Sequence, residues 1–66
     1  MTTAEKLVKA RGVESQAQVA EAIGIKQSTL SMYEHGLRVP RDHIKVKLAK
    51  YYRTTVQALF YGDDVT

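Results

Sequence analysis

The sequence predicts an all-α protein, folded as a compact five-helix bundle. Apolar residues recur at spacings of three and four in five short segments, and no segment alternates with the two-residue period of a strand. Glycines at 12, 24, 36 and 62 each follow such a segment, where a helix end favours a left-handed residue. With only 66 residues, we expect a single domain over residues 1–66.

The first two helices are predicted from paired signals at both ends. Thr2 with Glu5, and Ser15 with Gln18, have the spacing of a capping box, in which each side chain caps the other residue's backbone. We therefore expect helices over residues 3–11 and 16–23, ended by the glycines at 12 and 24.

The remaining helices have weaker start signals. A third helix is expected from near Gln27 to before Gly36, although Lys26 at its N-cap is a poorer cap than Ser or Thr. A fourth is expected over residues 41–52, after a proline loop. A last short helix is expected over residues 56–61, capped by Thr55 and stopped by Gly62.

Residues 16–35 are predicted to form a helix-turn-helix. Ala20 and Gly24 are small where the two helices meet, and Leu30 lies on the seam that they share. Glu34 is expected to be a buried structural acid paired with Lys9 or Arg11, and the sequence leaves both partners open.

The charge distribution favours an anionic partner. The whole chain carries +3, but residues 26–53 hold seven Lys and Arg against two acidic residues, an excess of +5 that begins at the third helix. A solvated lysine-rich face is the alternative explanation of this excess.

Catalytic and metal-binding patterns are absent from the sequence. There is no cysteine, His35 and His43 lack a metal-ligand spacing, and neither a Ser/His/acid set nor a glycine-rich phosphate loop occurs. No segment approaches the roughly 20 apolar residues of a membrane span. We therefore expect no enzyme, metal, cofactor, small-molecule substrate or membrane partner, and a cytoplasmic location.

The start of the third helix is where a helix-turn-helix enters the major groove of DNA, and Gln, Lys and Ser side chains there can bond to base edges. Free N–H groups at the start of the second helix suit a phosphate. All these polar residues are also common on solvated helices. The expected base contacts are Lys26, Gln27, Ser28, Ser31 and Met32, and the expected phosphate contacts are Ser15, Gln16, His35, Arg38, Arg41 and Lys45.

The stretch SQAQVAEAIGIKQSTLSMYEHGLRVP resembles the helix-turn-helix of the Cro and phage-repressor (XRE-type) family, and LAKYYRTTVQALF resembles that family's fourth and fifth helices. The resemblance implies a lambda-repressor-like DNA-binding domain acting as a dimeric transcriptional regulator. It also implies phosphate contacts at Ser15 and Gln16, base contacts at the positions given above, and a basic partner in helix one for Glu34. Glu14 stands where the family usually has an apolar residue.

We therefore expect a Cro-type repressor, of phage or prophage kind, that binds double-stranded DNA as a homodimer in the nucleoid of a bacterial or phage-infected cell. Two copies would place their recognition helices about 34 Å apart on a near-palindromic operator. The alternative is an antitoxin or adaptor that uses the same fold to bind a protein. Residues 55–66 are the expected dimer region, with contacts at Val56, Leu59, Phe60 and Tyr61.

Overall fold

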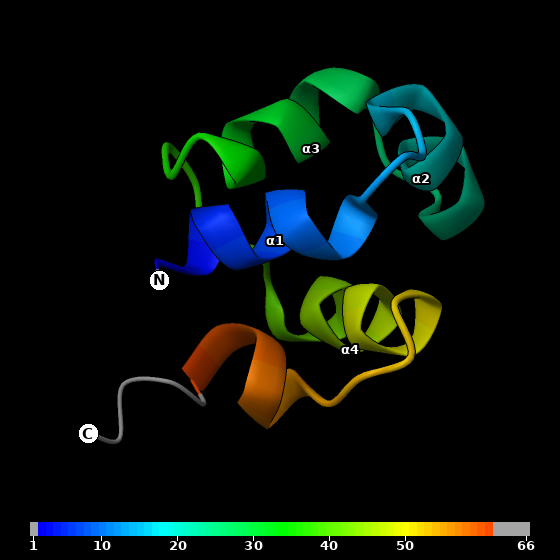
Figure 1. The fold of residues 1–66 in the computed structure, drawn as a ribbon. Helices are drawn as coiled ribbons and strands as arrows, with labels where there is room; N and C mark the ends of the chain where they lie inside the picture. Colours follow the sequence, from blue (N-terminus) through cyan, green and yellow to red (C-terminus); the bar gives the residue numbers. More distant parts are fainter. Residues whose placement is uncertain (1, 62–66) are drawn as a thin grey trace.

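The computed structural model describes residues 2–61, which form five helices and no strand (Figure 1). The helices are α1 (Thr3–Arg11), α2 (Gln16–Ile23), α3 (Gln27–Glu34), α4 (Asp42–Tyr51) and a π-helical turn, η1 (Gln57–Tyr61). The all-α prediction is confirmed.

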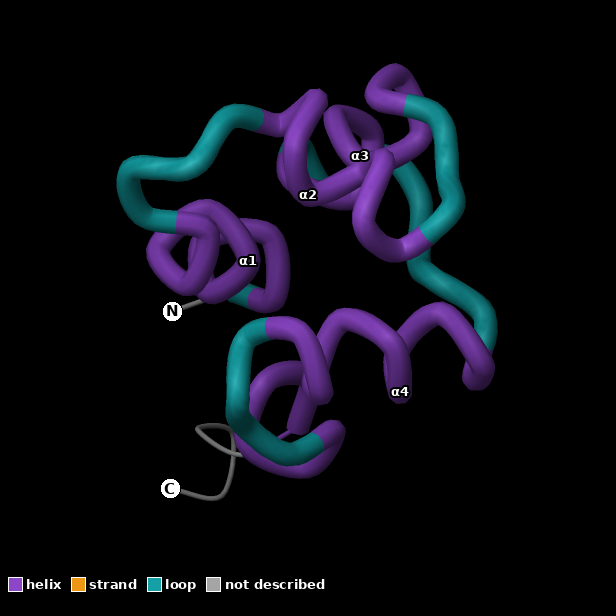
Figure 2. The backbone as a smooth tube through the Cα atoms, turned by 90° about the vertical axis from the view of Figure 1, so that its right-hand side faces the viewer, coloured by secondary structure: helices purple, strands orange, loops and turns teal. Residues whose placement is uncertain are grey.

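The arrangement of the helices leaves α3 at the edge of the molecule. Helix α1 passes between α3 on one side and η1 on the other (Figure 1), and it contacts both. Helix α2 packs against α3 and α4, so that α2 and α3 lie together at one end of the molecule (Figure 2). One face of α3 is consequently covered, while none of the helices in residues 2–61 lies over its opposite face (Figures 1 and 2).

A single apolar cluster holds the helices together. Each α-helix contributes one side chain with no exposed surface: Leu7, Val19, Leu30 and Leu48. Burial of a side chain of this size stabilises the fold by about 2 kcal/mol. Val8, the residue after Leu7 in α1, is 43% exposed.

Both predicted capping boxes are present. The Thr2 hydroxyl accepts from the Glu5 N–H at 3.2 Å, and the Ser15 hydroxyl accepts from the Gln18 N–H at 3.0 Å. These local contacts explain why α1 and α2 have the bounds expected from the sequence. Helix α4 is one residue shorter at each end than expected, because Arg41 is its N-cap and Tyr52 its C-cap.

Three helix ends share one hydrogen-bond pattern, the Schellman motif, whose defining residue has a positive φ. At the ends of α2 and α3 that residue is glycine, with φ of 80° at Gly24 and 73° at Gly36. At the end of α4 it is Arg53, with φ of 58°. Three bonds close these motifs. The Ile25 N–H donates to the Ala20 carbonyl at 2.9 Å, the Leu37 N–H to the Met32 carbonyl at 3.0 Å, and the Thr54 N–H to the Ala49 carbonyl at 2.8 Å.

The last helix differs from its prediction in type. Thr55 caps it as expected, because its hydroxyl accepts from the Ala58 N–H at 3.0 Å. However, the turn over Gln57–Tyr61 is π-helical, and it begins one residue later than predicted. The expected stop at Gly62 lies outside the described residues.

Candidate nucleic-acid interface

Helix α3 separates its apolar and polar side chains between two faces. Leu30 and Tyr33 point into the core, with 0% and 6% of their surfaces exposed. Lys26, Gln27 and Ser28, at the start of the helix, are all exposed. Lys26 makes no side-chain capping hydrogen bond, as expected of an ammonium, which has no acceptor for a helix N–H.

The second turn of α3 presents Ser31 and Met32, which are half-buried, and then His35 at its C-cap. The His35 Nδ1 lies 2.7 Å from the Ser31 carbonyl oxygen and 3.3 Å from the Ser31 hydroxyl. In the neutral ring, donation to that carbonyl places the proton on Nδ1 and leaves Nε2 as an acceptor. Only the imidazolium form of His35 then offers a second N–H to a phosphate.

The start of α2 offers backbone N–H groups beside α3. The capping box satisfies the Gln18 N–H, and the Ser15 hydroxyl lies 3.3 Å from the Gln18 Oε1. The N–H groups of Gln16 and Ala17, in the first turn, have no intrahelical acceptor, as at any helix start. An incoming phosphate therefore meets backbone donors here more readily than the engaged Ser15 hydroxyl.

Glu34 is the buried centre of a polar cluster that joins three segments. Its side chain is 2% exposed and accepts from Arg11 Nε at 2.8 Å and Arg11 Nη2 at 3.2 Å. Gln16 Nε2 donates to the same carboxylate at 2.8 Å. The hydrogen bond to Glu34 raises the pKa of the Arg11 guanidinium. Of the two partners left open by the sequence, Arg11 is the one used.

This cluster also changes the interpretation of Gln16. The sequence suggested a phosphate contact, but the structure commits one side-chain N–H of Gln16 to Glu34. Its backbone N–H and its second amide hydrogen are not used by this hydrogen bond. The Glu34 cluster thus fixes the start of α2 against the end of α3, which are the two segments that would meet DNA together.

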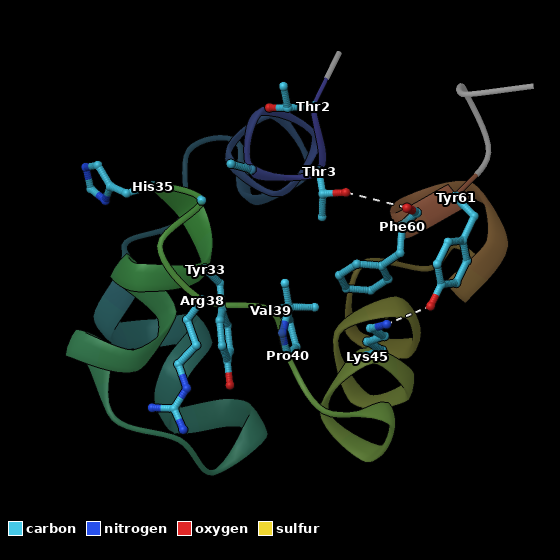
Figure 3. Close-up of a pocket in the computed structure, with 12 residues that line it drawn as sticks. Thr2, Thr3, Tyr33, His35, Arg38, Val39, Pro40, Lys45, Phe60 and Tyr61 are labelled. Carbon is cyan, nitrogen blue, oxygen red and sulfur yellow. Dashed lines mark hydrogen bonds between the residues drawn. The ribbon is translucent and has the colours of Figure 1, made fainter. Parts of the chain in front are cut away.

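The basic residues after α3 fall into two groups. Arg38 and Arg41 are exposed. Lys45 instead points its ammonium into a groove of about 500 Å³, where it donates to the Tyr61 hydroxyl at 2.6 Å (Figure 3). The ammonium also lies 5.0 Å from the Tyr61 ring centroid and 5.6 Å from that of Phe60. Lys45 is therefore occupied within the fold, whereas the two arginines are not held in this way.

The burial of η1 requires a correction to the expected dimer contacts. Leu59 and Phe60 are each 5% exposed and belong to the core of the single chain, so they offer almost no surface to a partner. The reason is that η1 packs directly on α1. Val56 is partly buried against the same core, and Tyr61 remains 47% exposed.

One contact of α4 was not predicted from the sequence. Tyr51 lies off the apolar face of α4, and the structure shows its hydroxyl donating to the Glu14 carboxylate in the loop between α1 and α2. Its ring also packs edge-on against Tyr52, with centroids 5.5 Å apart. Val46, the other apolar residue off that face, stays 42% exposed, and nothing in the structure explains it.

Comparison with known families agrees with this geometry. A helix-turn-helix family model of the XRE type matches residues 15–59, which is more than half of the chain. The chain belongs to this helix-turn-helix family. It is accordingly a DNA-binding regulator of XRE type, and its family is not one of enzymes. No curated protein matches the chain.

Metal-ligand clusters and membrane-spanning helices are absent from the described residues. No group of three or more potential metal ligands occurs within residues 2–61. None of the helices described has the length and apolar character needed to cross a bilayer.

Proposed function

We propose that this protein is a dimeric repressor of Cro type that inserts α3 into the major groove of a near-palindromic operator. The observation that carries the proposal is the division of α3 into a buried face and an exposed polar start. A helix held in this way can present side chains to base edges without unpacking the core. The proposed base contacts are Lys26, Gln27, Ser28, Ser31 and Met32.

The proposed phosphate contacts surround that face. The start of α2 supplies backbone N–H groups at Gln16, and the exposed Arg38 and Arg41 follow α3. Ser15 contributes only if its N–H or its hydroxyl leaves the Gln18 Oε1, which now accepts from both, and His35 contributes through its imidazolium form. Lys45 contributes only if its ammonium leaves the Tyr61 hydroxyl, so we place it behind the two arginines.

A dimer is proposed because one copy reads too few bases. Each good base contact discriminates by only about 1–3 kcal/mol, and a two-fold pair doubles the number read. The dimer surface that remains after the correction is built on Val56 and Tyr61. Val39, 73% exposed on the wall of the same groove as Tyr61, extends it.

The experiment measures binding to DNA from upstream of the protein's own gene and to a shuffled duplex, by fluorescence anisotropy at two salt concentrations. Gln27→Ala should weaken binding to the operator and relax the preference at one base pair, by a factor of roughly 10. The control is Thr54→Ala, an exposed polar residue outside the proposed DNA and dimer contacts, which should change neither affinity. Equal losses on both duplexes would remove Gln27 from base reading.

The same titrations test the phosphate contacts and the alternative function. Arg41→Ala should weaken binding to both duplexes and reduce the salt slope by about one unit per bound copy. Lys50→Ala, an exposed cation at the far end of α4, is its control. Wild-type protein with no preference for any upstream duplex would contradict the repressor and favour an adaptor that binds a protein through this fold.

A further inference from the structure

The loop between α1 and α2 is fixed by three hydrogen bonds to one residue, Glu14. Its N–H donates to the Arg11 carbonyl at 3.2 Å, and its own carbonyl accepts from Arg11 Nη1 at 2.7 Å. Its carboxylate accepts from the Tyr51 hydroxyl, 37 residues further along the chain at the end of α4. Within residues 2–61, the hydrogen bond that holds the Glu14 side chain comes from Tyr51.

The partner in this contact is a phenol hydroxyl and not a cation. The hydrogen bond to Glu14, followed by burial, raises the pKa of the Tyr51 hydroxyl above its ordinary value, which keeps the hydroxyl protonated and donating at neutral pH. Tyr52 packs against the core, and the ring of Tyr51 packs edge-on against it. This packing orients the Tyr51 ring. The oriented Tyr51 ring therefore carries its hydroxyl to the Glu14 carboxylate.

The position of Glu14 matters because Ser15, the next residue, is the N-cap of α2. The unsatisfied N–H groups and the helix dipole make this end of α2 attractive to any anion. A glutamate so close to it is an intramolecular competitor for the place of a DNA phosphate. A released charge need not reach the N–H groups to weaken a phosphate contact there, because charges interact over roughly 8 Å at physiological salt.

We propose that Tyr51 is a positioning residue for DNA binding, whose hydroxyl holds the Glu14 carboxylate against α4 and so keeps the start of α2 open to a phosphate. This inference rests on the proposed function, since it assigns a role at the phosphate contact of α2. It places a determinant of affinity on α4, on a residue that itself touches no DNA.

The test is a double-mutant cycle. Tyr51→Phe removes only the hydroxyl, and Glu14→Gln removes the charge while keeping an oxygen that accepts from Tyr51. Tyr51→Phe should lower operator affinity roughly threefold at low salt and by less at high salt, because a released charge is screened. Glu14→Gln should lose no affinity, and adding Tyr51→Phe to Glu14→Gln should cause no further loss.

Two outcomes of the cycle would overturn the proposal. One is a loss from Tyr51→Phe that is equal in both backgrounds and independent of salt, which would mark Tyr51 as a purely structural residue. The other is unchanged affinity in Tyr51→Phe.

A second measurement needs no DNA and keeps this inference separate from the proposed function. In an acid titration followed by NMR, the Gln16 and Ala17 amide resonances should shift more in Tyr51→Phe than in wild type, because the freed carboxylate approaches them. Glu14→Gln in the same background should abolish the additional shift. Identical titrations in wild type and Tyr51→Phe would contradict the restraint. A wild-type protein without operator preference would contradict the repressor, whatever the amides show.

Discussion

Among the contacts that join separate helices through charged side chains, those of Glu34 and Lys45 lie in opposite surroundings. Glu34 is buried and receives three hydrogen bonds from Arg11 and Gln16, which come from α1 and α2. Lys45 lies at the open groove and makes one hydrogen bond, to Tyr61, with two aromatic rings nearby. The first contact joins the helices that would meet DNA, and the second attaches the last helix to α4.

The two contacts should differ in their effect on stability, because water can replace the partner of Lys45 but cannot replace the partners of Glu34. A buried carboxylate that loses its donors cannot be solvated, so the three hydrogen bonds of Glu34 act as a unit on the fold. An ammonium at an open groove exchanges the Tyr61 hydroxyl for water at little net change in free energy. We therefore expect the Glu34 cluster to set stability and the Lys45 contact to leave it almost unchanged.

The largest expected effect is that of Glu34→Ala. The substitution leaves the Arg11 guanidinium, 20% exposed, and the Gln16 amide without their shared acceptor. The free energy of unfolding should fall by about 3 kcal/mol, measured by urea denaturation with circular dichroism. Arg11→Met, which removes the cation and retains its length, is the companion variant and should also destabilise the protein. A change below about 0.5 kcal/mol in Glu34→Ala would refute the comparison, since that is the range of surface substitutions.

The next effect has the opposite sign and concerns Tyr52, which lies near the same cluster. Its hydroxyl is buried and has no hydrogen-bond partner among the described residues, and burial, followed by the charge of Glu34, raises its pKa to about 12. Tyr52→Phe removes an unsatisfied polar group, so the free energy of unfolding at neutral pH should rise by about 1 kcal/mol.

The pKa of Tyr52 gives a second measurement on the same variant. Because the folded pKa lies above the unfolded value near 10, the folded state favours the neutral phenol. The stability that this preference contributes is present below about pH 10 and is lost as the pH rises toward 12. Wild type should therefore lose more stability than Tyr52→Phe over that interval, and parallel curves would show that the hydroxyl is solvated.

The parts of the fold that the sequence predicts are those fixed by neighbouring residues. The bounds of α1 and α2 depend on capping pairs three residues apart, Thr2 with Glu5 and Ser15 with Gln18, and both pairs are present. The end of α4 was harder to locate, because Arg53 adopts the positive φ for which glycine is the usual signal. The spacing of the apolar residues in η1 does not indicate that this turn is π-helical.

The candidate site was predictable only in part, for a related reason. The exposure of Gln27 and Ser28 follows from the burial of Leu30 on the same helix. In contrast, Glu34 and Arg11 are 23 residues apart and Tyr51 and Glu14 are 37 apart, so only the packing of helices brings them together. Periodicity marks a residue such as Phe60 as apolar, but it does not distinguish a core position from a dimer surface.

The smallest effect tests the other half of the comparison. Tyr61→Phe removes the hydroxyl that accepts from Lys45 and keeps the ring whose centroid lies 5.0 Å from the ammonium. The free energy of unfolding should change by less than about 0.5 kcal/mol, because the site is open to water and the cation–π contact survives. If DNA draws Lys45 away from Tyr61, the same variant should bind operator slightly more tightly, since the ammonium no longer has to leave the hydroxyl. A loss of stability approaching that of Glu34→Ala would show that the open groove does not weaken this contact, and the distinction between the two contacts would fail.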